Sequence, residues 1–493
     1  MIRRLALVAS LLGSGATGAQ TPTIRIDDAG PGIGPAILAH VLAEPHAVVI
    51  PGRARYVFAR GSDSRRTVVV LGRDAVVEGK VQGDLIVVAG DLYMHPGGVV
   101  TGRAISIGGG IYESMLTSIG VGATEFRDFT YDITSVPSGY ALRYRSLAAP
   151  GEVGVTWPGI FGFGTPTYDR SNGVSLGFGP KYVANGSRFS VAPTGTYRSQ
   201  LGEFDPGGVT EAQLDRRTAV RLKWGRTTSS NDRWIWNDAI NSAMFLYNGD
   251  DTRNYYRATG GDFRLSRVWE SVGATLTPYI GVRYERASSV RPGLTALGGP
   301  WTIFARGDAE RDDRLRPNPP IDDGALTSGI LGAVLNWSTS SLSGRLRADG
   351  EASSRFAQLT VGGYTTFPTF GTQSLHAEIH VVASGGSHVP RQRFAYIGGP
   401  GSVSTIELLS EGGDQLVYVD GGYDFPLRRV SLPLIGSPLF TLREALGGAR
   451  VGSFPTLHQS SGVRVTAGGP YFEWMVDPAK RTSEISFGLW FPP

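Results

Sequence analysis

The stretch Leu342-Ser-Gly-Arg-Leu-Arg-Ala-Asp-Gly-Glu351 decides the fold of this chain. Its even positions carry only leucine, alanine and glycine, whereas its odd positions carry serine and the charged residues Arg345, Arg347, Asp349 and Glu351. Successive side chains of a β-strand point to opposite faces, so this alternation predicts a strand with one apolar and one charged face.

The same period-2 pattern recurs along the chain, at Val220–Trp224, Leu276–Glu285, Leu375–Val381 and Ile485–Phe491. Soluble sheets rarely need many strands of about ten residues, whereas a tilted strand that crosses a bilayer needs about 9–11 residues. Four aromatic residues are expected near strand ends, where interfacial girdles lie: Trp224, Tyr284, Trp337 and Trp474.

Connections of two kinds alternate between these strands. Ser338–Ser341 reads as a tight turn, whereas 287–324 is a long polar segment. In lipid every backbone polar group must be paired, so the strands must close on themselves. The sequence therefore predicts an all-β fold in which residues 151–493 form a transmembrane antiparallel β-barrel. At roughly 20 residues for each strand and connection, the barrel has about 16 strands.

The composition excludes several other classes of protein. Only 41% of the 493 residues are hydrophobic, 69 are glycine and none is cysteine, so a helical membrane protein and a disulfide framework are both excluded. The net charge is +4 with the arginines dispersed, which argues against a nucleic-acid partner.

The first residues resemble a secretory signal. Arg3 and Arg4 precede the apolar run Leu5–Leu12, and residues 1–19 are predicted as a signal peptide. Export combined with a barrel predicts the outer membrane of a Gram-negative cell, with outer-membrane lipids as partners and the N-terminal domain in the periplasm.

A small repetitive domain precedes the barrel. Residues 20–66 form an N-terminal segment with a possible helix at Ile33–Leu42, and residues 113–150 form a linker. Between them, in 67–112, Val76–Val81 is echoed by Val99–Ala104, and Asp84–Gly90 by Ile105–Gly109. Short aliphatic runs that end in glycine predict a β-solenoid-like domain.

This domain resembles the bactofilin-type polymer-forming domain. The match lies in Val77-x-Gly79-x-Val81-x-Gly83-Asp84 and in Val100-x-Gly102, within a repetitive region of roughly 45 residues. The resemblance implies stacked rungs that polymerise, and a capped solenoid without polymerisation is the alternative.

The last hundred residues resemble the BamA-type superfamily of outer-membrane barrels, also known as the bacterial surface antigen domain. The matching pieces, in order, are Ile397–Val403, Gly413-Asp414, Val417–Leu427, Ser461–Arg464 and Phe472–Pro478. The family's internal loop carries an arginine that pairs with a luminal acid. Here that place reads Val403-Ser-Thr-Ile406, so the loop–wall ion pair is expected to be missing and Asp420 to lack its partner.

The resemblance and the strand pattern together give candidate luminal or internal-loop positions, and no catalytic, cofactor or metal-binding residue is expected. The candidates are Gly398, Gly399, Ser404, Thr405, Asp420, Asp424, Arg345, Arg347, Asp349 and Glu351, the last four as a salt-bridge ladder. His376 and His380 point the same way on a strand but lie about 13 Å apart, too far to share one zinc ion.

The resemblance implies a non-enzymatic barrel with a role in outer-membrane protein assembly or translocation, or as a surface antigen. Its partners would be unfolded outer-membrane clients or periplasmic envelope components. Two alternatives stay open, a passive channel for small solutes and an outer-membrane lipid hydrolase. The chain has no Gly-x-Ser-x-Gly motif, which makes the hydrolase the less favoured alternative.

Overall fold

The computed structural model describes residues 22–489, apart from 31–32, 115–116, 128, 148–152, 185–187, 216, 272, 291–315, 340–341, 428–429 and 431–436. The predicted signal peptide, residues 1–19, lies outside the described residues. Among the residues that are described, no helix is both long and apolar enough to cross a bilayer.

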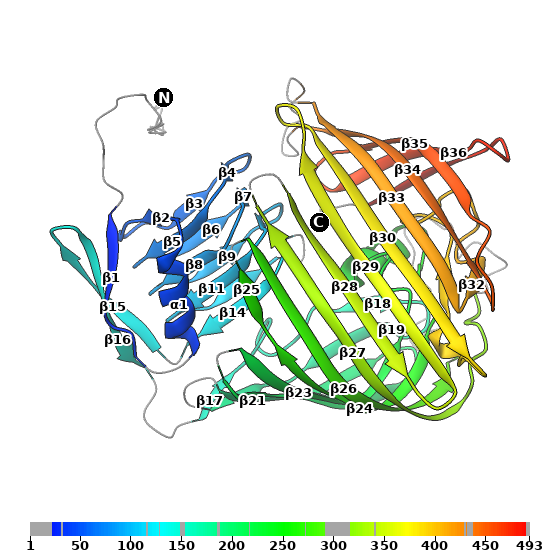
Figure 1. Cartoon of the computed structure of the whole chain (residues 1–493), viewed down its shortest axis with the longest axis horizontal. Coiled ribbons are helices and arrows are strands. Elements are labelled where there is room, and N and C mark those ends of the chain that lie inside the picture. The colour runs from blue at the N-terminus through cyan, green and yellow to red at the C-terminus, as the bar shows by residue number, and fades with distance from the viewer. Residues whose placement is uncertain are drawn as a thin grey trace, which may run out of the picture.

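The N-terminal domain is a β-solenoid of three parallel sheets, shown in blue and cyan in Figure 1. The first sheet contains β2 (His46–Val49), β5 (Thr67–Leu71), β8 (Leu85–Val88), β11 (Arg103–Ile107) and β14 (Gly122–Phe126). The second contains β3 (Tyr56–Phe58), β6 (Ala75–Val77), β9 (Leu92–Met94) and β12 (Ile111–Glu113). The third contains β4 (Asp63–Ser64), β7 (Lys80–Val81), β10 (Val99–Val100) and β13 (Ser118–Ile119).

The register of the rungs differs from the repeat seen in the sequence. The structure stacks Val81 on Val100 and places Gly83 below Gly102, whose N–H donates to the Gly83 carbonyl at 3.0 Å. The sequence comparison had matched Val81 with Ala104, which is wrong. Glycine recurs at several corners of the solenoid, so the short sequence motifs of two rungs can be aligned in more than one way. The hydrogen bonds between stacked strands decide which residues of the two rungs lie beside each other.

Two apolar cores stabilise the solenoid. The interior holds side chains from all three sheets, among them Val70, Val77 and Val100. The outer face of the first sheet is buried as well, because α1 (Ile33–Ala43) and the strands β1 (Thr23–Asp28), β15 (Phe129–Val136) and β16 (Gly139–Ser146) cover it. The helix lies where the sequence predicts one, whereas 113–146, expected as a linker, contains strands of the solenoid and of its cover.

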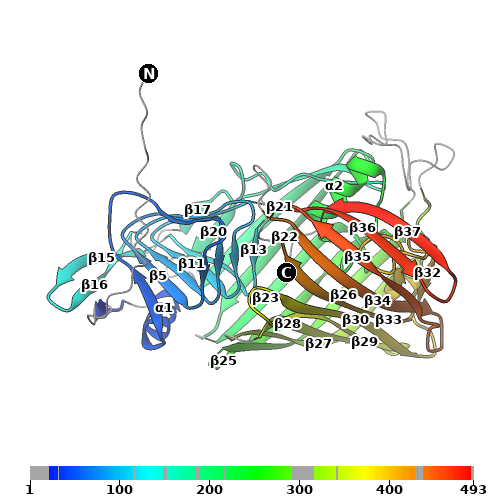
Figure 2. The same cartoon turned by 90° about the horizontal axis from the view of Figure 1, so that it is seen from above.

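The second domain is one antiparallel sheet of 19 strands that curls into a barrel (Figures 1 and 2). Its strands are β17 (Val153–Thr156), β18 (Thr167–Asp169), β19 (Gly173–Phe178), β20 (Lys181–Ala184), β21 (Phe189–Arg198), β22 (Glu203–Gln213), β23 (Thr218–Ser229), β24 (Tyr256–Arg267), β25 (Trp269–Ser271), β26 (Ala274–Ser289), β27 (Gly324–Ser338), β28 (Ser343–Ala352), β29 (Phe356–Pro368), β30 (Ser374–Gly386), β33 (Gln415–Pro426), β34 (Leu439–Arg450), β35 (His458–Thr466), β36 (Pro470–Asp477) and β37 (Thr482–Leu489).

Three pairs of these strands lie end to end against common neighbours: β17 with β18, β19 with β20, and β24 with β25. Counted as continuous strands, the 19 of the described sheet become 16, so the predicted fold class and strand number are confirmed. β17–β18 and β37 are the two edges of the described sheet, and no pairing between them is found among the described residues. The boundary between these two edges is called the seam below.

The two faces of the barrel wall differ in polarity. Ile280 and Leu331 point outward and are each 62% exposed, whereas Arg443 and Glu473 point inward and are buried. The outward aromatic residues Trp224, Tyr284 and Trp474 lie in the middle of their strands, and only Trp337 lies near a strand end. The expectation that all four lie near strand ends is therefore wrong, because alternation fixes the face of a residue but not its height.

The connections define two ends of the barrel. The end with the turn Ser338–Ser343 is called the near end, and it faces the solenoid (Figure 1). There Arg103 pairs with Glu270 at 2.6 Å, and the hydroxyls of Thr101 and Ser338 lie 3.0 Å apart. The opposite, far end carries three long connections, 230–255, 290–323 and 387–414, of which 291–315 lies outside the described residues.

Candidate functional site: the barrel lumen and its loops

The connection 387–414, called the internal loop below, folds into the far end of the barrel. It contains the 3₁₀ turn η2 (Arg391–Arg393) and a small hairpin of β31 (Ala395–Ile397) and β32 (Glu411–Gly413). Gly398 and Gly399, both candidate positions, follow β31 with φ of 125° and 84°. A Cβ at Gly398 would lie 2.2 Å from the Glu407 carbonyl oxygen, so the turn requires glycine there.

The next candidate positions fix the internal loop to the barrel wall. The Ser404 hydroxyl donates to Glu473 on β36 at 2.9 Å, and the Thr405 and Ser460 hydroxyls lie 2.6 Å apart. Val403, between them and the hairpin, is fully buried in an apolar cluster with Ile397 and Tyr418. The structure therefore brings Ser404 and Thr405 to the luminal face of β35 and β36.

Asp420 has an arginine partner after all. Arg443, on the adjacent strand β34, approaches Asp420 to 2.6 Å and Glu473 to 3.0 Å, and Arg464 approaches Glu473 to 2.6 Å. Arg443 also donates to the Ser402 carbonyl of the internal loop at 3.1 Å. The expectation that Asp420 lacks a partner is wrong, because the arginine comes from the neighbouring strand rather than from the loop.

The internal loop also contributes an arginine of its own, upstream of the family-like motif. Arg393 pairs with Glu285 on β26 at 2.9 Å and with Glu351 on β28 at 3.0 Å, and it donates to the Tyr256 hydroxyl at 3.1 Å. Burial disfavours its charge, but Tyr256 and the two carboxylates outweigh burial and raise the pKa of Arg393. The sequence analysis missed this residue because it searched for the arginine only after Ile397.

The predicted salt-bridge ladder on β28 forms only in part. Arg347 pairs with Asp349, which also accepts a hydrogen bond from the Tyr279 hydroxyl. Glu351 turns instead to Arg283 at 2.8 Å and to Arg393, and no ion pair of Arg345 is found in the described part of the chain. Charges of one strand therefore pair mainly with residues on other strands and loops.

The histidines of β30 have separate partners. His376 lies 2.9 Å from Asp424, whose carboxylate also accepts from the Thr441 hydroxyl at 2.6 Å, and 3.9 Å from Asp420. His380 instead stacks on Trp234, with ring centroids 4.5 Å apart and planes 7° apart. His376 is thus flanked by carboxylates.

A second loop, 230–255 between β23 and β24, also fills the far end. Trp234 packs against Tyr418 of the opposite wall at 4.9 Å, and Ile235 and Trp236 form an apolar cluster with Leu409 of the internal loop. The sequence analysis missed this loop. Its signal in the sequence is a pair of apolar runs, Trp234-Ile235-Trp236 and Ala243–Tyr247.

A buried carboxylate joins the two loops. Asp232 accepts hydrogen bonds from the backbone N–H of Asn254 and of Tyr396, both at 2.9 Å. Burial raises the pKa of Asp232 to about 7, although these N–H groups and the guanidinium groups of Arg316 and Arg170 oppose the rise. The joint between the loops is therefore expected to respond to pH near neutrality.

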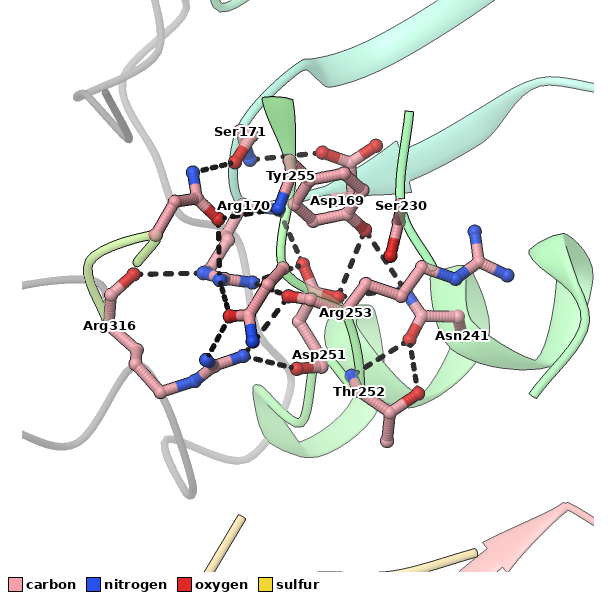
Figure 3. A network of polar contacts seen from close by, with 12 residues as sticks. Asp169, Arg170, Ser171, Ser230, Asn241, Asp251, Thr252, Arg253, Tyr255 and Arg316 are labelled. Atoms are coloured by element: carbon pink, nitrogen blue, oxygen red, sulfur yellow. Dashed lines mark hydrogen bonds and ion pairs between the residues drawn. The ribbon is translucent and has the colours of Figure 1, made fainter. Parts of the chain in front are cut away.

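A network of buried charges covers the tip of the first hairpin, between β18 and β19 (Figure 3). The Arg170 side chain is fully buried and pairs with Asp251 at 3.3 Å. It also donates to the Arg316 carbonyl at 2.9 Å and to Asn318 at 2.8 Å. Asp251 accepts from Asn241 and Tyr255, both at 3.0 Å, so the network ties the hairpin to loop 230–255 and to the end of 290–323.

Below the loops the lumen keeps a cavity of about 350 Å³ between β21 and β26. Lys223, Arg226, Arg283, Asp262 and Glu285 contribute charges to its lining. No cluster of three or more acidic or histidine side chains suited to a metal ion is found among the described residues. The lumen therefore contains a cavity with a charged lining, and packed loops fill the far end where the chain is described.

No protein-family model matches the chain, and no curated protein matches it. Among solved structures it is similar to BamA from Haemophilus ducreyi lacking POTRA domains 1–3, with 10% identity, 73% of this chain and 75% of that chain covered, and a TM-score of 0.44. It is also similar to CdiB from Escherichia coli (13% identity, 73% and 66% covered, TM-score 0.38) and to CdiB from Acinetobacter baumannii (11%, 73% and 65%, 0.36). Similarity at this level assigns neither an activity nor a partner, so the barrel is assigned from its own strand pairing.

Proposed function

We propose that this protein is a non-enzymatic outer-membrane β-barrel that assists the assembly or translocation of other outer-membrane polypeptides, with its solenoid in the periplasm. The observation that carries the proposal is the seam, because the sheet begins at β17–β18 and ends at β37. The solenoid would present periplasmic envelope components or unfolded clients to the near end.

The outward face supports the placement in a membrane. Large apolar side chains such as Ile280, Leu331 and Trp474 are 46–62% exposed there, and they recur on most strands. A water-soluble protein rarely exposes apolar patches of more than a few hundred Å². Burying this face in lipid removes that cost, while the charged groups stay in the lumen.

The seam supports the proposed role in the assembly or translocation of other polypeptides. An edge strand presents backbone N–H and C=O groups that seek partners, and in hydrocarbon each unsatisfied group costs several kcal/mol. Edge strands therefore recruit extended segments of other polypeptides by strand addition. A barrel whose wall has two edges is suited to accept a client strand from the side.

The filled far end favours this function over steady conduction. The internal loop and loop 230–255 share apolar clusters with β30, β33, β34 and β37 of the barrel wall. Side chains of the described residues therefore occupy space that a simple pore leaves to water. The same loops lie at the end away from the solenoid, where a surface antigen would be displayed.

Depletion tests the proposal. We expect the levels of folded barrel proteins in the outer membrane to fall when the protein is depleted, and to recover with the intact chain or with Arg345→Gln. Arg345 has no ion pair among the described residues, so its replacement should leave the lumen intact. Arg345→Gln is therefore a control for the effect of any single substitution in the lumen. Unchanged levels of all outer-membrane proteins after depletion would rule out the assembly role.

A passive channel is the second candidate, and the cavity of about 350 Å³ with its charged lining favours it. It predicts a steady conductance in planar bilayers for the intact chain. An electrically silent barrel would reject the channel and leave the assembly role in place.

A further inference from the structure

The helix α2 (Asp238–Asn248) is a well-bounded unit within loop 230–255. The Asn237 side chain accepts a hydrogen bond from the Ile240 N–H at 2.9 Å at its start. Gly249 ends it with φ of 83° and donates its N–H to the Phe245 carbonyl. Both ends are thus capped within the chain, so α2 can move as one body.

One side of α2 covers the first edge of the sheet. The backbone N–H of Tyr168, on β18, donates to the Ser242 hydroxyl at 2.9 Å, and the rings of Tyr168 and Phe245 lie 5.0 Å apart. A side chain of the helix therefore satisfies a backbone donor on an edge strand, where a pairing strand would otherwise be needed.

The same side of α2 is tied to the tip of the first hairpin by buried polar groups. The Asn241 amide donates to Asp251 and its carbonyl accepts from the Thr252 N–H at 2.9 Å. Asp251 in turn holds Arg170, whose side chain is fully buried (Figure 3). Separating α2 from the hairpin would break the hydrogen bond between Ser242 and the Tyr168 N–H and leave a backbone donor of an edge strand without this partner, which is unfavourable.

The buried face of α2 also approaches the last edge of the sheet, because Met244 lies beside Asn241 and Phe245 on that face. Leu489, the final residue of β37, packs against the apolar cluster that contains Met244 and Trp236. Contacts of this kind are non-directional, and their loss uncovers no buried charge.

We propose that α2 is a latch across the seam, hinged on the β18–β19 hairpin and closing on β37. When the seam opens, α2 stays with the first hairpin and separates from Leu489, because the polar attachment is the stronger of the two. The latch requires only that the seam opens. The further statement that a client strand enters there rests on the proposed function.

The absence of cysteine from the chain allows distances to be measured between paired spin labels. One pair, Leu246→Cys with Phe178→Cys, joins α2 to the first hairpin. The second pair, Leu246→Cys with Ile485→Cys, joins α2 to β37. All three side chains are exposed, at 40–46%, so their replacement leaves the packed loops intact.

In the full-length protein folded in lipid vesicles we expect one narrow distance distribution for the first pair. The second pair should show a short population and a longer one. A single narrow distribution for the second pair would overturn the latch, and a long population in the first pair would overturn the hinge.

Leu489→Ala provides the second measurement. Loss of about half of the burial free energy of a leucine should raise the long population of the second pair about tenfold. No change in that population would show that Leu489 does not hold the latch closed. Because these distances are measured without a client, they stand or fall separately from the depletion experiment.

Discussion

The Nη1 atom of Arg443 donates hydrogen bonds to both carboxylate oxygens of Glu473 at 3.0 Å, and both side chains are buried inside the barrel. Asp420 and Arg464 complete the cluster, and Ser404 of the internal loop donates to the same carboxylate. An ion pair between two strands of the barrel wall, β34 and β36, thus fixes the place at which the internal loop docks.

Arg443→Met should destabilise the barrel by about 3–5 kcal/mol, because it leaves Asp420 buried without its arginine and Glu473 with Arg464 alone. Urea unfolding of the protein in lipid vesicles measures the change. Arg345→Met removes a luminal arginine outside this cluster and should have little effect. Equal losses for the two variants would contradict the structural role assigned to Arg443.

Thr101→Cys with Ser338→Cys should form a disulfide between the solenoid and the near end of the barrel. The two hydroxyl oxygens lie 3.0 Å apart, so sulfur atoms in their place can reach bonding distance with small shifts. A non-reducing gel of the oxidised protein detects the cross-link, and each single variant is the control. A pair that stays reduced under oxidant would show that the domains do not dock in this way.

The contact between loop 230–255 and the internal loop should weaken as pH rises. The pKa of Asp232 is raised to about 7 in the folded protein, so the protonated form stabilises the contact at acidic pH. This contribution is lost as pH rises from about 4 through 7, where the buried carboxyl ionises.

Limited proteolysis of loop 230–255 should therefore be faster at pH 8 than at pH 5. Asp232→Asn removes the titrating group and should abolish the pH dependence, although it weakens the contact at every pH because one acceptor is lost. A pH dependence that persists in this variant would assign the effect to another group.

Arg393→Ala should loosen the start of the internal loop, because it removes the contacts to Glu285, Glu351 and Tyr256 together. Brief openings in planar bilayers should become more frequent than in the intact chain. Arg391→Ala, on the same 3₁₀ turn, is the matched control. Identical recordings for the two variants would show that Arg393 does not hold the loop in the lumen.

Much of the barrel was predictable because alternation is a local property. Each residue of Leu342–Glu351 lies on β28 or directly before it, as expected. The expectation of about 16 strands followed from the length of the barrel region at roughly 20 residues for each strand and connection. The height of a side chain in the barrel depends on strand tilt and register, which is why Trp224 and Trp474 were misplaced.

The candidate site was predictable only in part. Ser404, Thr405 and Asp420 do lie together in the lumen, because order along the chain placed the loop beside its strands. The partners Arg443 and Arg393 depend on which strands and loops become neighbours across the barrel. Trp234 was missed although it lies in an apolar run, because the sequence does not show which surface that run packs against.

The central claim is that residues 151–493 form a lipid-embedded β-barrel, and electrophoresis of the outer-membrane fraction tests it most directly. Folded barrels resist SDS, so the unheated protein should migrate faster than the boiled protein in a gel of that fraction. A protein that stays soluble without detergent, with one mobility before and after boiling, would contradict the account.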